Sequence, residues 1–185
     1  GLGIGPRAIG AVLGIVKAYT TRVGEGPLPS ELHGEEGDLL RESGREYGAS
    51  TGRPRRCGWY DAVAVRHAVR VNGLDALAVT KLDVLDGLAE IPMCTAYRCG
   101  DEILREFPSR GAALAACEPV YDTVPGWTRP TAGVRRYEEL PPEAQAYLAR
   151  IESLTGVPIA IVSTGSDRAD TIVAEGGLVD RWRAD

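Results

Sequence analysis

Apolar and polar positions alternate with helical spacing in four stretches of the chain, and each stretch predicts a helix. Residues 8–19 place apolar side chains at intervals of three and four. Residues 35–46 are polar and predict an exposed helix, whereas residues 59–71 are largely apolar and stop at an Asn-Gly pair. The fourth stretch, 141–154, begins with two prolines and ends before Gly156, as helices commonly do.

Short apolar runs between these stretches predict buried strands at residues 76–79, 91–97 and 158–162. Residues 99–130 read as irregular, with short strands around Val120 and Tyr121. Alternating helices and apolar strands indicate an α/β fold, with a mostly parallel sheet and flanking helices. At 185 residues the chain is long enough for one domain, or one domain with an appendage. We expect its tail to dock through Val179 and Trp182.

Two loops follow predicted strands, where parallel sheets bind their ligands. Thr80-Lys81-Leu82-Asp83 places a carboxylate where it could accept two hydrogen bonds from guanine, with a lysine stem to cover the purine face. Ser163-Thr164-Gly165 could hold guanine O6 through its backbone amides and a hydroxyl. Each loop alone is more typical of a solvated turn; the two together make a guanine pocket as good an interpretation as two plain turns.

A third loop, 49–56, combines hydroxyl groups with alternating arginines, which bind carboxylate or phosphate groups through paired hydrogen bonds. A solvated basic turn is the alternative, and a nucleic-acid contact is a weaker one. The glycines of the fourth loop, 22–27, would let a ligand approach the backbone closely, although spacing alone favours a plain loop. No Walker A phosphate loop occurs anywhere in the chain.

The charge of the chain is uneven. Its net charge is −5, but residues 41–70 carry seven arginines against three acidic residues, which makes that segment +4. An acidic protein with one basic patch suits a small anionic ligand better than nucleic acid. No apolar run is long enough for a membrane helix. From the charge and the apolar runs together, we expect neither a nucleic-acid nor a membrane partner.

Cysteine and histidine usage argues against a metal site. The four cysteines form no Cys-x-x-Cys pair, and the only histidines are His33 and His67. The first residues lack the charged and apolar regions of a secretory signal peptide. We therefore expect four reduced thiols in a cytoplasmic protein rather than disulfides. The chain also lacks an initiating Met, and we expect it to be processed, trimmed or a fragment.

Four segments, in order and at matching spacing, resemble motifs of the adenylosuccinate synthetase family. Two further segments, 120–127 and 154–159, are also similar to it. The resemblance spans nearly the whole chain and implies a C-terminal portion of a larger single-domain enzyme with a guanine site like that of P-loop GTPases. The four segments are Lys17-Ala18-Tyr19-Thr20-Thr21-Arg22-Val23-Gly24-Glu25-Gly26-Pro27, residues 48–59, residues 80–87 and Ser163-Thr164-Gly165-Ser166-Asp167-Arg168.

The resemblance implies a reaction and its substrates. The family joins IMP to L-aspartate with GTP as co-substrate and Mg²⁺ as cofactor, in the purine pathway to AMP. GTP phosphorylates O6 of IMP, and the aspartate amine then displaces that phosphate to give adenylosuccinate. The family resemblance also implies a homodimer for the full enzyme.

The resemblance also implies roles for individual residues. Val23, Gly24 and Arg53 would contact IMP. The loop of Ala49, Ser50, Thr51, Gly52, Arg53, Pro54 and Arg55 would close on aspartate. Arg55 would also reach GTP, whose guanine would be read by Lys81, Leu82, Asp83, Ser163, Thr164 and Gly165.

The sequence departs from the family pattern at two positions and over a large segment. The family usually has Thr at Ser50, where Ser keeps the hydroxyl, and Pro at Ser166, so the guanine loop is less rigid here. The family's N-terminal part carries the phosphate loop, the Mg²⁺ ligand, the catalytic Asp and the catalytic His, and none is matched here. Neither His33 nor His67 fits the catalytic motif. We therefore expect no metal ligand in this segment and no activity from it alone.

A non-catalytic GTP- or dicarboxylate-binding module remains the alternative interpretation. It would use the same loops without turnover. A purely structural domain would leave the four ordered loops unexplained.

Overall fold

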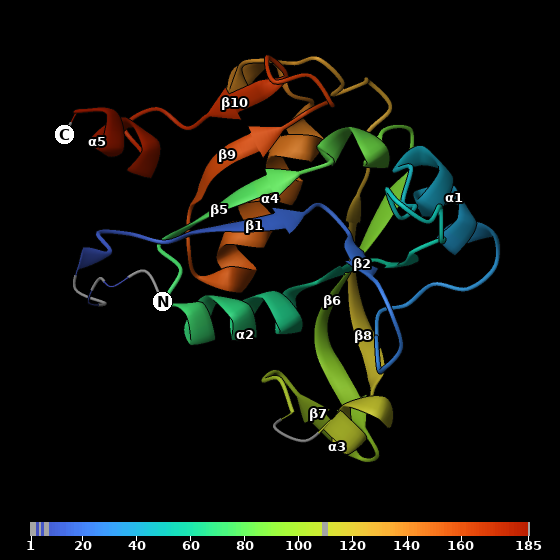
Figure 1. Ribbon diagram of the computed structural model, residues 1–185. Coiled ribbons are helices and arrows are strands. Elements are labelled where there is room, and N and C mark those ends of the chain that lie inside the picture. The colour runs from blue at the N-terminus through green and yellow to red at the C-terminus, as the bar shows by residue number, and fades with distance from the viewer. Residues whose placement is uncertain (1–2, 4, 6–7, 109–110, 185) are drawn as a thin grey trace.

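A four-stranded sheet in the order β1-β5-β9-β10 forms the centre of the molecule (Figure 1). The computed structural model describes residues 3, 5, 8–108 and 111–184. Strands β1, β5 and β9 are parallel, and β10 runs antiparallel to β9, so the predicted mostly parallel sheet is confirmed for this layer. The strands span Leu13–Lys17 (β1), Ala76–Thr80 (β5), Ile159–Ser163 (β9) and Thr171–Val173 (β10).

Helix α4 (Pro142–Thr155) packs against one face of this sheet through the main hydrophobic core. Its fully buried Leu148 lies in the same core cluster as Val79 of β5 and Val162 of β9. Prolines at its start supply no N–H that would go unpaired, and Gly156 ends it in the left-handed conformation. The sequence predicted this helix correctly.

Helix α2 (Ala62–Asn72) begins three residues later than its apolar pattern suggests. The Asp61 carboxylate accepts a hydrogen bond from the Ala64 N–H at 3.0 Å and so caps the helix. Asp61 is also the last residue of strand β4 (Tyr60–Asp61), so the chain enters the helix directly from a strand. Gly73, in the left-handed region, closes the other end as predicted.

The predicted helix over residues 8–19 is wrong, because residues 13–17 form strand β1. Its partner is β5, with Leu13 opposite Ala76 and Lys17 opposite Thr80. Gly14 is a poor helix residue, and in the strand it lies against Leu74, where a Cβ would come within 2.4 Å of Leu74 Cδ1. Sheet pairing therefore overrides the helical spacing, as tertiary context often does.

A second sheet extends away from the first as an arm (Figure 1). Strand β6 (Glu90–Cys99) pairs in parallel with β4 and antiparallel with β7 (Glu102–Leu104) and β8 (Glu118–Pro125). The expected strand over 91–97 is confirmed. The strand expected around Val120 and Tyr121 is confirmed by β8, but the rest of 99–130 is more regular than expected, since β8 alone is eight residues long. Most side chains of β8 are exposed, so its sequence carries no apolar pattern that predicts a strand of this length.

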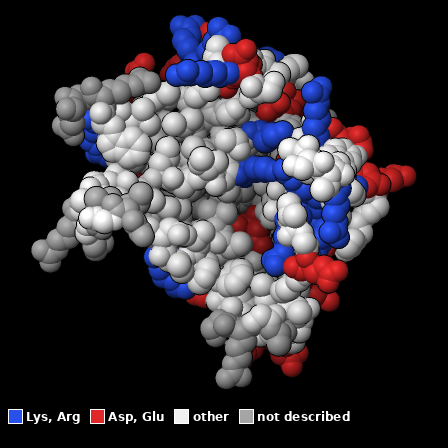
Figure 2. All heavy atoms as spheres, viewed as in Figure 1, with Lys and Arg blue, Asp and Glu red and all other residues white. Residues whose placement is uncertain are grey.

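A small antiparallel sheet and one helix lie beside the carboxyl end of β1. Strand β2 (Thr20–Arg22) pairs with β3 (Arg56–Gly58), and α1 (Glu35–Ser43) packs nearby with Leu40 buried. Helix α1 confirms the polar helix predicted over 35–46, apart from its last residues. Figure 2, drawn from the same side as Figure 1, shows Lys and Arg side chains gathered in this part of the surface.

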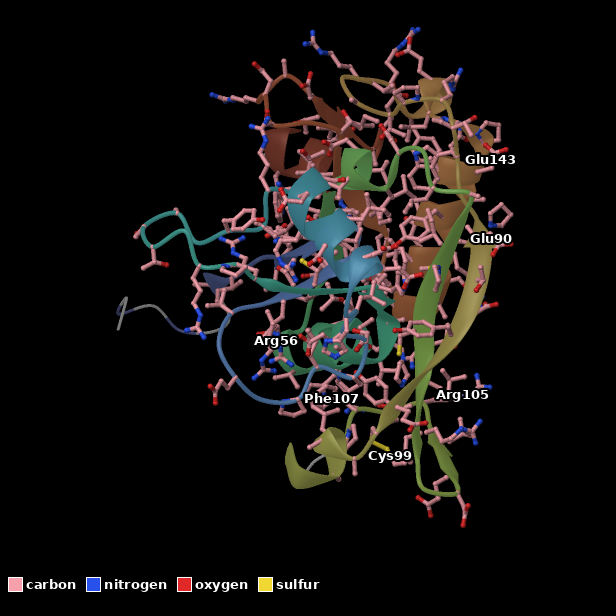
Figure 3. The ribbon with its side chains drawn as sticks, turned by 90° about the vertical axis from the view of Figure 1, so that its right-hand side faces the viewer. Arg56, Glu90, Cys99, Arg105, Phe107 and Glu143 are labelled. Atoms are coloured by element: carbon pink, nitrogen blue, oxygen red, sulfur yellow. A yellow bond between two sulfur atoms is a disulfide. The ribbon has the colours of Figure 1, made fainter. Side chains whose placement is uncertain are left out.

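The arm is attached to α2 by contacts with residues 105–107 and with Thr95 of β6. The Phe107 ring stacks on His67 with centroids 4.7 Å apart (Figure 3). Arg66 donates hydrogen bonds to the carbonyls of Thr95 and Arg105, and Arg70 forms an ion pair with Glu106. Helix α3 (Gly111–Ala115) follows this segment.

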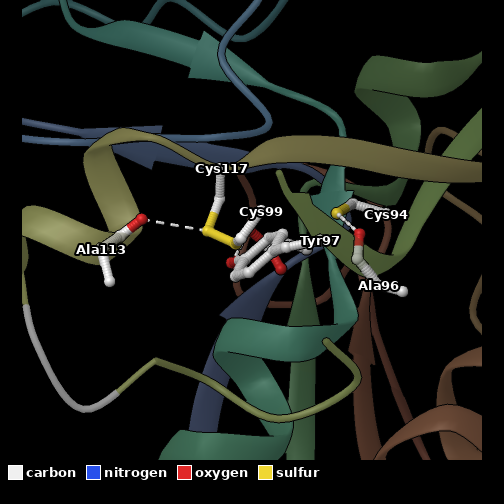
Figure 4. Close-up of a disulfide and its surroundings, with 7 residues drawn as sticks. Cys94, Ala96, Tyr97, Cys99, Ala113 and Cys117 are labelled. Carbon is white, nitrogen blue, oxygen red and sulfur yellow. Dashed lines mark hydrogen bonds between the residues drawn. A yellow bond between two sulfur atoms is a disulfide. The ribbon is translucent and has the colours of Figure 1, made fainter. Parts of the chain in front are cut away.

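A disulfide joins Cys99 to Cys117 at the end of the arm (Figure 4). Cys99 follows Arg98 and Cys117 precedes Glu118, which are paired in the β6–β8 register, and the two cysteine Cα atoms lie 4.4 Å apart. The expectation of four reduced thiols is therefore wrong for this pair, whereas Cys57 and Cys94 are free and buried. Sequence spacing alone could not show it, because only the strand pairing brings the two thiols together.

The tail forms helix α5 (Leu178–Ala184). Leu178 is buried against Ala76 and Ala160, and Val179 packs on the same cluster, as predicted. Trp182 does not dock, since 44% of it is exposed. The final residue of the expected tail, Asp185, lies outside the described residues.

Breaking the disulfide should loosen the arm. Closing an 18-residue separation stabilises a chain by about 3 kcal/mol in the loop-entropy model. We expect Cys99→Ser to lower the free energy of unfolding in urea by up to that amount, and to speed proteolysis within residues 100–116. A reductant should reproduce the effect on the wild type and change nothing further in the variant. Equal stability of the oxidised wild type and the variant would contradict this assignment.

Candidate functional site

Three parallel strands end at one edge of the central sheet, and this edge organises the candidate site. The register sets Lys17 of β1 opposite Thr80 of β5, and Val79 of β5 opposite Val162 of β9. The loops that begin at Lys81 and Ser163 therefore leave the sheet side by side. The two loops that the sequence assigns to guanine are brought together.

The first loop turns sharply after β5. Lys81 adopts the left-handed conformation with φ at 64°, which is unusual for a residue with a side chain and typical of functional turns. Its ammonium donates a 2.7 Å hydrogen bond to the carbonyl of Gly44, at the end of α1. Leu82 is fully buried and anchors the single 3₁₀ turn Leu82–Leu85 that follows.

Two carboxylates of this loop have different surroundings. Asp86 accepts hydrogen bonds from Trp127 Nε1 at 2.6 Å, and from the Thr131 hydroxyl and amide at 2.7 and 2.8 Å. The Asp83 carboxylate is half-buried and accepts no hydrogen bond from any other residue that the structure describes. Burial raises the pKa of Asp83, and neighbouring Asp86 adds to this while Lys81 opposes it. Asp86 thus holds the loop together, and Asp83 keeps free acceptors.

The second loop uses its side chains internally. The Ser163 hydroxyl donates to the Gly165 carbonyl at 3.0 Å. Thr164 is fully buried, and its hydroxyl donates to the Val134 carbonyl at 2.7 Å. This hydrogen bond fixes the loop to the interior of the molecule. A Cβ on Gly165 would lie 2.6 Å from an Asp170 carboxylate oxygen, so glycine lets the loop pass close to Asp170.

The other two predicted loops meet at one end of the small sheet. Strands β2 and β3 are antiparallel, with Arg22 opposite Arg56. The loop that leaves β2 at Val23 and the loop that enters β3 from Arg55 are therefore neighbours. The structure brings together the residues assigned to IMP and to aspartate.

The glycine loop is held by arginines on both sides. Arg22 donates to the carbonyls of Glu25 and Pro27, both at 3.1 Å. Arg56 donates to the carbonyls of Gly24 and Gly26, at 3.3 and 2.7 Å. These contacts engage backbone oxygens, while the Val23 side chain is 73% exposed.

The basic loop forms a tight tip. The Gly48 N–H donates to the Arg53 carbonyl, and the Gly52 N–H donates to the Gly48 carbonyl, both at 2.8 Å. The Arg53 N–H reaches the Thr51 hydroxyl at 3.3 Å. The tip is exposed, together with the Arg53 side chain. Its other exposed members are Ala49, Ser50 and Pro54, whereas Arg55 is half-buried.

Sequence reasoning missed three charged residues that hold these loops. Glu46, only 1% exposed, accepts hydrogen bonds from Lys17, Tyr19 and Arg55. Arg56 pairs with Glu31 and clamps the glycine loop. The sequence placed Glu46 at the end of a polar helix and Arg56 within a basic run, and neither pattern indicates burial.

The described residues contain no group of three or more His, Cys, Asp or Glu side chains that could hold a metal ion. They also contain no helix that is both long and apolar enough to span a membrane.

Comparisons with known proteins decide the family. The family model described as adenylosuccinate synthetase matches residues 1–172. Adenylosuccinate synthetase of Desulforudis audaxviator is 58% identical over 93% of this chain, and that of Alkalilimnicola ehrlichii is 57% identical over 95%. The chain belongs to the adenylosuccinate synthetase family. It spans about two-fifths of the length of these curated relatives, 40% of each.

A solved adenylosuccinate synthetase has the same fold. The fully ligated enzyme from Plasmodium falciparum superposes with a TM-score of 0.90 at 38% identity, over 95% of this chain and 42% of that one. The α/β fold and the partial match to an adenylosuccinate synthetase, both predicted from the sequence, are confirmed.

Replacing Asp83 should separate stability from ligand binding. Because burial raises its pKa in the folded chain, the ionised carboxylate is less favourable there than in the unfolded chain and lowers stability at neutral pH. We expect Asp83→Asn to unfold in urea at the same or a higher midpoint, yet to lose affinity for GDP. Wild-type affinity should fall as the pH is lowered, beginning above the usual titration range of an aspartate, because protonation removes an acceptor. A marked loss of stability in Asp83→Asn would show that this carboxylate has a structural partner.

Proposed function

We propose that this chain supplies the aspartate, IMP and guanine subsites of an adenylosuccinate synthetase. The reaction would join IMP and L-aspartate through 6-phosphoryl-IMP at the expense of GTP, in purine nucleotide synthesis. Membership of the family supports the reaction, and the arrangement of the four loops supports the assignment of subsites. The chain by itself would bind ligands without turnover.

The free carboxylate of Asp83 is the observation that carries the proposal. Guanine presents N1–H and an exocyclic amine side by side, and a carboxylate accepts both hydrogen bonds. Adenine lacks this pair of donors. Lys81, Leu82, Ser163, Thr164 and Gly165 would complete the pocket, Leu82 and Thr164 by supporting its walls from the core.

The arginines of the basic loop would hold the dicarboxylate. A guanidinium pairs with a carboxylate through two parallel hydrogen bonds, so two arginines match the two carboxylates of aspartate. Arg53 is exposed and Arg55 is half-buried, in a loop whose tip also offers the Thr51 hydroxyl. Arg55 would in addition reach GTP.

IMP would lie between the glycine loop and the basic loop, with Val23, Gly24 and Arg53 against its ribose. Because Arg56 holds the carbonyls of Gly24 and Gly26, the backbone there is positioned before a ligand arrives.

Phosphoryl transfer needs groups beyond those described. Mg²⁺ is the family's metal, and the described residues contain no group of three or more His, Cys, Asp or Glu side chains that could hold it. We propose that its ligands and the acid–base pair belong to parts of the enzyme outside this chain. Without them the transferred phosphoryl group has no electrostatic support. A homodimer and a cytoplasmic location are further proposals for the complete enzyme.

Guanine selectivity tests the nucleotide site directly. We expect calorimetric titration of the chain to detect GDP and not ADP, even at millimolar affinity, and Asp83→Asn to abolish the difference. Equal binding of both nucleotides would contradict the role of Asp83. Binding of neither would show that the pocket needs the rest of the enzyme to form.

Reconstitution tests the reaction. The chain would be fused after the part of the Desulforudis audaxviator relative that it does not match, and adenylosuccinate formation measured. We expect activity that requires GTP, IMP and aspartate, and that Arg53→Ala lowers by at least tenfold. A folded fusion that binds GDP but forms no product would favour the alternative, a non-catalytic binding module.

A further inference from the structure

A buried carboxylate lies behind the basic loop, where no sequence motif marks it. Glu46 follows α1 and is 1% exposed. One of its oxygens accepts hydrogen bonds from Lys17 Nζ at 2.6 Å and Tyr19 Oη at 2.5 Å. The other oxygen accepts from Arg55 Nη1 at 2.7 Å. All three donors come from segments other than that of Glu46.

These bonds connect the edge of the central sheet to the loop. Lys17 is the last residue of β1, opposite Thr80, from which the guanine loop continues. Arg55 is the last residue before β3. A carboxylate without partners would be very costly at this depth, so the two cations and the phenol must stay in place to compensate it. Glu46 therefore constrains Arg55 relative to the sheet.

The backbone reinforces the same position. The Arg55 N–H donates to the Glu46 carbonyl at 2.8 Å, and Arg41 Nε donates to the Arg55 carbonyl at 2.9 Å. Yet Nε of Arg55 is buried without a hydrogen-bond partner in the structure. One side of the guanidinium is thus anchored while a donor remains unused.

Arg53, two residues before Arg55, has no such anchor among the described residues. The Arg53 side chain is exposed and makes no hydrogen bond or ion pair with the residues that the structure describes. Two arginines of one loop thus differ in their contacts: Arg55 is held by Glu46, and Arg53 has no side-chain contact to break before it meets a ligand.

We propose that Glu46 is a positioning residue that pre-organises Arg55 for the anionic substrate, while Arg53 is recruited on binding. The identity of the substrate as a dicarboxylate rests on the proposed function. The anchoring of Arg55 does not. Because a pre-organised side chain loses little freedom on binding, removing its anchor should weaken affinity even where the fold is kept.

Two measurements on the 185-residue chain test this proposal. The first is the NMR order of the Arg55 Nε–H group, assigned with Arg55→Lys. We expect it to be rigid in the wild type and mobile in Glu46→Gln. The second is the affinity for succinate, which should fall at least tenfold in Glu46→Gln.

Matched variants separate positioning from general stability. Glu36→Gln makes the same change at an exposed position on α1 and should leave both readouts as in the wild type. Glu46→Asp keeps the charge but shortens the side chain, so it should lower Arg55 order and succinate affinity together, and by less than Glu46→Gln. It also provides the test if Glu46→Gln fails to fold.

The outcomes distinguish this proposal from the function it rests on. If Arg55 stays rigid and succinate affinity is unchanged in a folded Glu46→Gln variant, the positioning role is overturned. If the wild type binds no succinate, the dicarboxylate assignment fails for the isolated chain. The NMR order of Arg55 still decides whether Glu46 anchors it.

Discussion

The compensation of one buried carboxylate ties the candidate site together. Glu46 is almost fully enclosed, and its charge is tolerated only because Lys17, Tyr19 and Arg55 donate to it. Burial alone would raise the pKa of Glu46, but these hydrogen bonds outweigh it and hold the pKa below its usual value. The group therefore stays ionised at neutral pH. The edge of the sheet and the basic loop cannot separate without exposing an unpaired charge.

The remaining loops divide support and ligand contact between neighbouring residues. The Asp86 carboxylate accepts hydrogen bonds from Trp127 and Thr131 and so holds the loop. The Asp83 carboxylate, three residues earlier, accepts none from the other described residues. Arg56 likewise holds the glycine loop, while Arg53 three residues earlier stays exposed, with no side-chain partner among the described residues. In each pair one side chain stabilises the loop, and the other keeps hydrogen-bonding groups available for a ligand, which lowers the stability of the fold.

The arm built on β6 and β8 is stabilised independently of this edge. The disulfide closes it, and Arg66 and Phe107 fasten its end to α2. Sequence reasoning underestimated the length of β8 because most of its side chains are exposed and its pairing with β6 is made by the backbone. Strand pairing over long sequence separations leaves little local signal.

The sequence by itself determined the family, the four loops and most helices and strands of the central layer. These depend on local patterns: a run of apolar residues at β5, prolines and a glycine around α4, and motifs read in order. Only the tertiary structure decided that residues 13–17 pair as a strand, that Cys99 meets Cys117, and that Glu46 is buried. Each of these depends on partners distant along the chain, because burial and pairing are properties of the folded arrangement rather than of any local window.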